Sequence, residues 1–428
     1  MKRVLVFCAL IVFFFSCFAC GKAPSADLAE DASSTPAPYE LGMTYHEVYD
    51  PDTDFDNRFG RCAPGMLETE DAYYFVSTTG NYIYYYDKYT EERGVLCGKP
   101  ECVHDELEIN ESCSGYVRAS GNGHANFYDG HIYYTGYSNS GDSPVRQSLY
   151  RMNPDGSSRE RLFPFTCTYE DFPNGGTQIH RGKLYGCSRS SLVAGAEPKE
   201  KVCLTCWDLE TGESKRIYER TDATQTFGLS VFYFGKYVYF CDSYFYLQQQ
   251  ERMTIVTVLR WDIEAEELET VYTGEGYGGS YYNIWVESEN KIYFAPNLCD
   301  AESTKVYCIS NGEVRIAVEL SNRYTASLMD GAVAFIDFLD ESPEPRFIVT
   351  DYEGNPLYDG KCSHAALEEL PGRPECMGYS AVYGDKDTVY IVYELDYHQV
   401  PRFRQCIVRY NLRDGEIVGT KLLCVSKW

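Results

Sequence analysis

The chain of 428 residues is poor in positive charge, in histidine and in the short motifs that usually mark an enzyme. Lys and Arg number 38 against 64 Asp and Glu, so the formal net charge is -26. This deficit argues against a nucleic-acid partner, because a phosphate backbone is bound through a basic surface. The sequence has no G-x-S-x-G elbow, H-E-x-x-H pair, P-loop or G-x-G-x-x-G segment after a strand. It therefore carries none of the signatures that these motifs give to hydrolases, metalloproteases and nucleotide-binding enzymes.

Long amphipathic helical runs are also missing, and the best candidate, residues 363–370, would make about two turns. Aromatic residues are abundant instead: they make up 15% of the chain, with 39 Tyr. Together with a hydrophobic content of 44%, this composition excludes a disordered chain. Tyr and Gly abundance favours β structure.

Residues 1–19 have the pattern of a lipoprotein signal peptide. Lys2 and Arg3 precede an uncharged apolar run over residues 4–19, which is shorter than the roughly 20 residues of a bilayer span. The segment Ala19-Cys20-Gly21 resembles a bacterial lipobox, and this resemblance implies that Cys20 receives diacylglycerol. A poorer lipobox ends at Cys17, and an uncleaved anchor or an ordinary signal peptide are the alternatives.

Residues 20–38 predict a lipidated Cys followed by a flexible linker, because they contain small residues and Pro and no aromatic. Without Lys2 and Arg3 the chain has 36 basic against 64 acidic residues, a charge of -28. That charge repels an anionic membrane, so attachment is expected to depend on the lipid. Residues 39–63 form a lead-in segment containing DPDTDFDN. It lacks the Gly and the Glu that a calcium-binding loop needs, so a solvated acidic segment is expected.

From residue 64 to 428 the sequence shows a faint repeat. A polar turn precedes a short apolar run rich in Tyr or Phe, and a second apolar run then ends in an Asp/Asn-Gly turn. Seven such units of about 52 residues predict an all-β fold, a β-propeller of seven four-stranded blades. A six-bladed ring and a pair of β-sandwiches are the alternatives. The first runs of the units cover residues 71–75, 130–134, 182–185, 235–240, 290–294, 331–335 and 387–391.

The lipobox, the turns such as Gly130-His131-Ile132-Tyr133 and the segment LCGKPECVHD at residues 96–105 together resemble a known group. This group is the secreted lipoproteins of anaerobic Gram-positive bacteria. Their propeller belongs to a domain-of-unknown-function family that is similar to the propeller of low-density lipoprotein receptor-related protein. The resemblance covers roughly residues 60–428 and implies a propeller outside the cytoplasm, on the outer face of the cell membrane. It implies no catalytic residues, and the Tyr-Trp-Thr-Asp tetrapeptide of the receptor propellers is absent.

Cys97, Cys102, His104 and Cys113 form the pattern C-x4-C-x-H-x8-C. Three thiols and one imidazole make a complete tetrahedral set for a structural zinc ion. In an exported protein the same thiols could instead form disulfides, Cys97 with Cys102 or Cys113 with Cys62, or stay free. None of these outcomes implies catalysis, because four protein ligands leave zinc no open position.

Long segments between the predicted strands are expected to share one face, where a ligand would bind. They cover residues 136–147, 186–200, 241–254, 295–303, 337–345 and 393–404. The candidate ligand-binding residues on them are Arg146, Arg189, Asp242, Tyr244, Asp300, Asp340, Asp396 and His398.

The sequence favours a membrane-anchored lipoprotein whose propeller is a non-catalytic binding or scaffolding module for a surface protein or a glycan. The alternative is a propeller enzyme of the glycoside hydrolase or lyase type that uses loop carboxylates.

Overall fold

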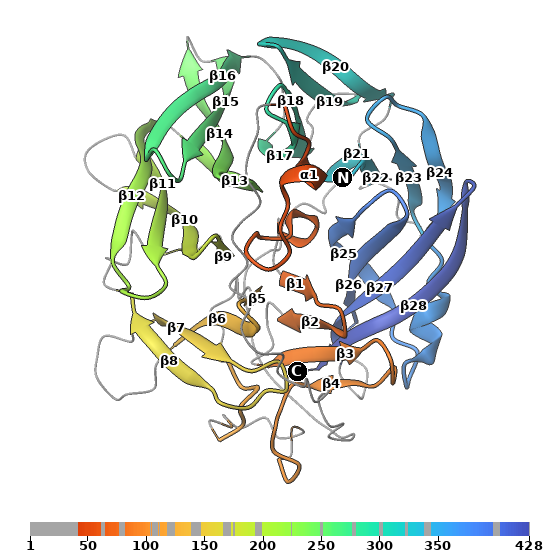
Figure 1. Cartoon of the computed structure of the whole chain (residues 1–428). Helices are drawn as coiled ribbons and strands as arrows, with labels where there is room; N and C mark the ends of the chain where they lie inside the picture. Colours follow the sequence, from red (N-terminus) through yellow and green to blue (C-terminus); the bar gives the residue numbers. More distant parts are fainter. Residues whose placement is uncertain are drawn as a thin grey trace.

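Figure 1 shows the fold of the chain in a computed structural model. The structure describes residues 42–60, 65–76, 82–102, 104, 110, 112–117, 125–137, 147–165, 173, 176–192, 199–223, 225–248, 251–275, 280–298, 303–321, 324–337, 344–396 and 403–427. The lipidation candidate Cys20, the linker and Cys62 lie outside these residues.

Seven antiparallel sheets of four strands each form a closed ring, which confirms the predicted seven-bladed β-propeller (Figure 1). Blade 1 contains β1 (Gly65–Glu68), β2 (Ala72–Val76), β3 (Ile83–Asp87) and β4 (Arg93–Val95). Blade 2 contains β5 (Ala125–Tyr128), β6 (His131–Tyr137), β7 (Gln147–Met152) and β8 (Glu160–Pro164). Blade 3 contains β9 (Thr177–His180), β10 (Lys183–Leu192), β11 (Lys199–Asp208) and β12 (Ser214–Ala223).

The remaining four blades follow in chain order. Blade 4 contains β13 (Gln225–Phe234), β14 (Tyr237–Gln248), β15 (Glu251–Asp262) and β16 (Glu267–Glu275). Blade 5 contains β17 (Ser280–Ser288), β18 (Lys291–Leu298), β19 (Thr304–Ser310) and β20 (Glu313–Leu320). Blade 6 contains β21 (Tyr324–Met329), β22 (Ala332–Asp337), β23 (Arg346–Thr350) and β24 (Pro356–Lys361). Blade 7 contains β25 (Cys376–Gly384), β26 (Thr388–Leu395), β27 (Phe403–Arg413) and β28 (Glu416–Lys427).

Each blade is a meander in which neighbouring strands in the chain pair with one another. The turns between the first and second strands and between the third and fourth strands therefore lie at one end of the ring, which we call the tight-turn end. Connections between the second and third strands, and crossings between blades, lie at the opposite end, which we call the loop end. The runs that begin each predicted unit form the second strands, β2, β6, β10, β14, β18, β22 and β26.

Aspartates fix the turns at the tight-turn end. The Asp208 carboxylate accepts hydrogen bonds from the backbone N–H groups of Glu210 and Thr211, at 3.1 and 3.0 Å. Gly212, at a φ of +69°, then closes the turn in a conformation that other residues adopt at a cost. Asp262 and Asp351 bind their own turns in the same way. This local chemistry explains why the Asp/Asn-Gly spacing located the hairpins.

The core lies between the blades, because a twisted four-stranded sheet buries both faces only against its two neighbours. Phe232 of blade 4 meets Trp285 of blade 5 edge to face, with ring centroids 4.9 Å apart. Tyr293 of blade 5 stacks on Tyr352, which follows β23 of blade 6. The abundant tyrosines thus serve mainly as packing groups between blades.

The ring closes without strand exchange, because blades 1 and 7 are each built from four consecutive strands. Side-chain packing and hydrogen bonds join the two blades. Their contact contains a buried cluster with Tyr73 and Phe75 from blade 1 and Tyr390 and Leu423 from blade 7. The hydroxyl groups of Tyr73 and Tyr390 lie 3.2 Å apart. Arg93 of β4 donates a hydrogen bond to the carbonyl of Leu422, at 2.9 Å.

Residues 42–60 lie across the centre of the ring and close its tight-turn end (Figure 1). This segment contains α1 (Tyr45–Val48) and the short 3-10 helix η1 (Asn57–Phe59). The Asn57 side chain bonds both backbone groups of Tyr233, with its Nδ2 2.7 Å from the carbonyl and its Oδ1 2.9 Å from the N–H. Phe59 is buried against Tyr383 and Tyr390.

Partners of this central plug, residues 42–60, lie near the first turn of six blades. They are Glu68, His180, Arg181, Tyr233, Ser288, Asp330 and Asp385. Arg58 spans the seam, because its guanidinium contacts Glu68 of blade 1 at 3.1 Å and Asp385 of blade 7 at 3.6 Å. The plug therefore acts as a common centre for the blades.

The expectation of a solvated acidic lead-in was wrong for Asp54. Its side chain is 3% exposed and pairs with Arg181 at 2.7 Å. His180, fully buried beside it, accepts a hydrogen bond at Nδ1 from the N–H of Phe55 and contacts the carbonyl of Gly235 through Nε2. Burial lowers the pKa of His180 to about 4, and the Asp54 carboxylate opposes this shift only in part.

Within residues 363–370, the structure has one short 3-10 helix, η3 (Ala365–Glu369), in agreement with the two turns expected there. In the described part of the chain, no helix has the length and apolar character needed to cross a membrane.

Two of the predicted long loops were wrong in extent. Most of residues 186–200 belongs to β10 and β11, and nearly all of residues 241–254 belongs to β14 and β15. In β15, half-buried and buried residues alternate from Met253 to Val258, which is the period of a paired strand.

Candidate metal centre and ligand-face residues

The structure brings the four predicted metal-binding residues together. Cys97, Cys102, His104 and Cys113 each offer a ligand atom, and these atoms all lie within 4.8 Å of one another. Cys97 and Cys113 are buried, and the other two are half-buried. None of the three cysteines is joined in a disulfide in this structure. The chain therefore has a candidate metal-binding cluster at the outer edge of blade 1, directly after β4.

Local backbone bonds shape this loop. The N–H of Leu96 donates to the carbonyl of Ile83 at 2.8 Å, and the N–H of Ile83 donates to the carbonyl of Gly115 at 3.0 Å. A side chain at Gly115 would clash, since a Cβ there would lie 1.9 Å from the Leu96 carbonyl oxygen. The loop thus returns to the start of β3, an inner strand of blade 1, and this return places Cys113 beside Cys97.

The protonation of the cluster is uneven. Burial raises the pKa of Cys97, but hydrogen bonds from Lys99 and Ser114 outweigh this effect, so the net pKa lies below the usual value. Burial and the neighbouring Cys97 charge raise the pKa of Cys113 and of Cys102. A negative charge on Cys97 therefore disfavours deprotonation of the two neighbouring thiols.

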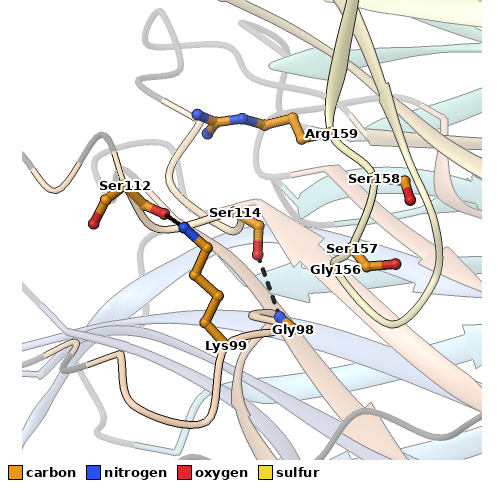
Figure 2. A pocket seen from close by; sticks show the side chains of 8 residues that line it. All are labelled: Gly98, Lys99, Ser112, Ser114, Gly156, Ser157, Ser158 and Arg159. Atoms are coloured by element: carbon orange, nitrogen blue, oxygen red, sulfur yellow. Dashed lines mark hydrogen bonds between the residues drawn. The ribbon is translucent and has the colours of Figure 1, made fainter.

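A shallow polar pocket of about 400 Å³ adjoins the cluster, between its loop and the β7–β8 turn of blade 2 (Figure 2). Its charged groups are Lys99 and Arg159. Lys99 donates to the carbonyl of Ser112, and Gly98 donates through its N–H to the Ser114 hydroxyl at 3.2 Å (Figure 2). The β7–β8 turn is bonded to the cysteine loop across this pocket, because Arg159 donates to the carbonyls of Cys113 and Tyr116 at 3.1 and 2.6 Å.

Three of the predicted ligand-face residues lie near the loop end of blades 3 and 4 and belong to one internal network. The Asp242 carboxylate accepts hydrogen bonds from Arg220, at 2.5 and 2.8 Å, and from the Tyr218 hydroxyl at 2.7 Å. The Arg220 guanidinium lies over the ring of Tyr244, 3.8 Å from its centre. Arg189 pairs with Glu200 at 3.2 Å, and Glu200 accepts the N–H of Thr226 at 2.7 Å.

This network links blades 3 and 4, and its central carboxylate is inaccessible. The Asp242 side chain is 0% exposed and that of Arg220 is 9% exposed. Placing Asp242 on an exposed ligand-binding loop was therefore wrong: it lies on strand β14 and serves as a buried ion-pair partner. Arg220 and Tyr218, on β12, were missed from the sequence because no motif pairs them with a residue on the next blade.

The other predicted ligand-face residues are only partly described. Asp396 directly follows β26, is half-buried and donates its N–H to the carbonyl of Glu375 at 2.9 Å. Arg146, Asp300, Asp340 and His398 lie outside the described residues.

Comparison with known proteins finds no matching family model and no matching curated protein. Solved structures with a similar fold do exist. An uncharacterised protein from Listeria monocytogenes has a TM-score of 0.40 and 10% identity, over 68% of this chain and 78% of that one. Oligogalacturonate lyase from Vibrio parahaemolyticus has a TM-score of 0.45 and 12% identity, over 80% and 88% of the two chains. The propeller domain of the Trilobed protease from Pyrococcus furiosus has a TM-score of 0.38 and 12% identity, over 71% and 93%. Any functional conclusion therefore depends on the residues of this chain.

Proposed function

We propose that this protein is a membrane-anchored lipoprotein whose propeller is a non-catalytic module that binds a surface protein or a glycan at its loop end. The observation that carries this proposal is the central plug. Residues 42–60 occupy the tight-turn end with contacts to six blades, which leaves the loop end as the place where a ligand can approach the centre of the ring.

The described charges near the loop end support binding rather than catalysis. Asp242 and Glu200 are held by Arg220 and Arg189 in ion pairs. The Asp242 carboxylate is buried and already accepts three hydrogen bonds, two of them from a guanidinium, so a substrate proton cannot reach it. Among the described residues, Asp242 and Glu200 therefore stabilise the packing of blades 3 and 4 beneath the loop end.

The position of the plug also orients the molecule in this proposal. Cys20 and Gly42 are separated by a stretch whose composition predicts a linker, and about 22 residues of random coil span roughly 26 Å. Since Gly42 begins the plug, a lipid on Cys20 would draw the tight-turn end toward the membrane. The charge of -28 keeps the body off anionic lipid, so the loop end would face outward.

Labelling with radioactive palmitate tests the anchor. We expect the full chain to incorporate label in a bacterial host, the Cys20→Ala variant to lose it, and the matched Cys17→Ala variant to retain it. Incorporation that persists in Cys20→Ala would refute the anchor site.

Glycan and surface-protein arrays test the binding role, using the chain from residue 21 onward. Saturable binding without release of shorter products is the expected result. Product release that Asp300→Asn or Asp340→Asn abolishes would replace this proposal with the enzyme alternative.

An epitope tag can test the orientation. A tag placed between β22 and β23, at the loop end, should be accessible to antibody on whole cells, whereas the same tag at the Glu353 turn should be shielded. The reverse pattern would overturn the orientation.

A further inference from the structure

We propose that Cys97, Cys102, His104 and Cys113 bind one zinc ion, and that this ion fastens the loop after blade 1 onto blade 2. The four ligand atoms lie within 4.8 Å of one another. Zinc bonded to sulfur at about 2.3 Å in a tetrahedron places its sulfur ligands roughly 3.8 Å apart. The side chains thus need only a small inward movement to reach the metal.

The set of ligands favours zinc over a disulfide. A disulfide would use two of the three thiols and would give no role to the third thiol and the imidazole beside it. A single divalent ion uses all four groups. Three thiolate sulfurs and one imidazole nitrogen suit zinc, whereas calcium and magnesium require oxygen ligands.

The surroundings resemble the outer shell of a metal site. The Ser114 hydroxyl donates to the Cys97 sulfur at 3.6 Å, and the Asn110 amide donates to the Cys102 sulfur at 3.5 Å. Such hydrogen bonds orient metal ligands and tune the metal that they hold. The ring of Tyr82 packs edge to face on His104, with centroids 6.0 Å apart.

The ion would join two blades. Arg159 and Gly156 belong to the segment between β7 and β8 of blade 2. Arg159 donates to the carbonyls of Cys113 and Tyr116. Gly156, at a φ of +79°, packs so closely on Cys97 that a Cβ would lie 3.1 Å from the Cys97 nitrogen.

The same ion would also fix one wall of the polar pocket. Lys99, Ser112 and Ser114 line the pocket and lie between or beside the ligands in the sequence (Figure 2). With four protein ligands the metal has no open position, so its role is structural. Removing it should loosen the loop and reduce the packing between blades 1 and 2.

Metal analysis of the full chain, purified without chelator and with oxygen excluded, tests the proposal. We expect one zinc per chain, and a loss of most of it in Cys97→Ser, Cys113→Ser and His104→Ala. The control Cys206→Ser, on β11 away from the cluster, should keep its zinc. Chain without stoichiometric zinc, or zinc retained in all three ligand variants, would overturn the proposal.

Cobalt substitution of the wild-type chain keeps the test decisive even if the variants fail to fold. Cobalt bound by three thiolates and one imidazole should give intense tetrahedral visible bands and a sulfur-to-metal charge-transfer band. Chelation should lower the melting temperature, and added zinc should restore it. A disulfide between any two of the three cysteines, found by mass spectrometry in freshly purified protein, would contradict the site.

Discussion

Truncating Phe59 should test whether the central plug belongs to the folded unit. Phe59 is 2% exposed and packs in the cluster that joins blades 1 and 7. Its ring lies edge to face against Tyr390 and Tyr383, with centroid distances of 5.4 and 6.3 Å. A Phe→Ala change at a buried site costs about 3–5 kcal/mol, from lost burial and from the cavity that remains. We expect Phe59→Ala to lose that much free energy of unfolding.

Equilibrium urea denaturation of the chain from residue 21, followed by circular dichroism, measures this loss. Phe59→Leu should recover most of it, because the cavity is then smaller. The control Tyr89→Ala removes an aromatic ring that is 71% exposed, and should change the free energy of unfolding by less than about 0.5 kcal/mol. If Phe59→Ala is no less stable than Tyr89→Ala, the plug unfolds separately and the account of ring closure is wrong.

Three further changes probe buried polar groups. The pKa of His180 is about 4 in the folded chain and near 6.5 in the unfolded chain, so the unfolded state takes up a proton first as the pH falls. The free energy of unfolding should therefore drop by about 3 kcal/mol between pH 6.5 and 4. In the same denaturation series His180→Gln should show a smaller drop. Asp242→Ala should lower the free energy of unfolding by about 3–5 kcal/mol, because it leaves the Arg220 charge buried without its carboxylate. The double variant Asp242→Ala/Arg220→Met should recover most of this loss. Equal stability of the single and double variants would refute the ion-pair role. Asn57→Ala should cost about 2–4 kcal/mol in chemical denaturation, since it leaves the N–H and carbonyl of Tyr233 without their side-chain partner, and an effect below about 1 kcal/mol would contradict this contact.

Much of the candidate metal site could be predicted from the sequence because its ligands lie in one loop. Three thiols and one imidazole at Cys97, Cys102, His104 and Cys113 limit the chemistry to metal, disulfide or free thiol. Their approach to within 4.8 Å depends on the return of the loop to β3, through the bond between Ile83 and Gly115. That pairing links residues of two segments, and no spacing rule predicts it.

The ligand face was harder to predict for a different reason. A charged residue near a strand end looks the same in the sequence whether it faces solvent or the next blade. Asp242 lies on β14 and its partner Arg220 on β12 of the preceding blade. Only the packing of those blades decides that the pair is buried, because burial depends on what covers a strand as well as on the strand itself.

The sequence by itself determined the blades. Apolar runs rich in Tyr or Phe and Asp/Asn-Gly turns are local properties of the sequence, so the second strands and the count of seven followed from residues close in the chain. The tertiary structure alone decided how the ring closes and what fills its centre. The plug contacts residues that are far away in the sequence, such as Asn57 with Tyr233 and Arg58 with Asp385. It also buries Asp54 against Arg181. Such contacts form only when distant blades are already in place, which is why a row of aspartates that looked solvated lies partly inside the protein.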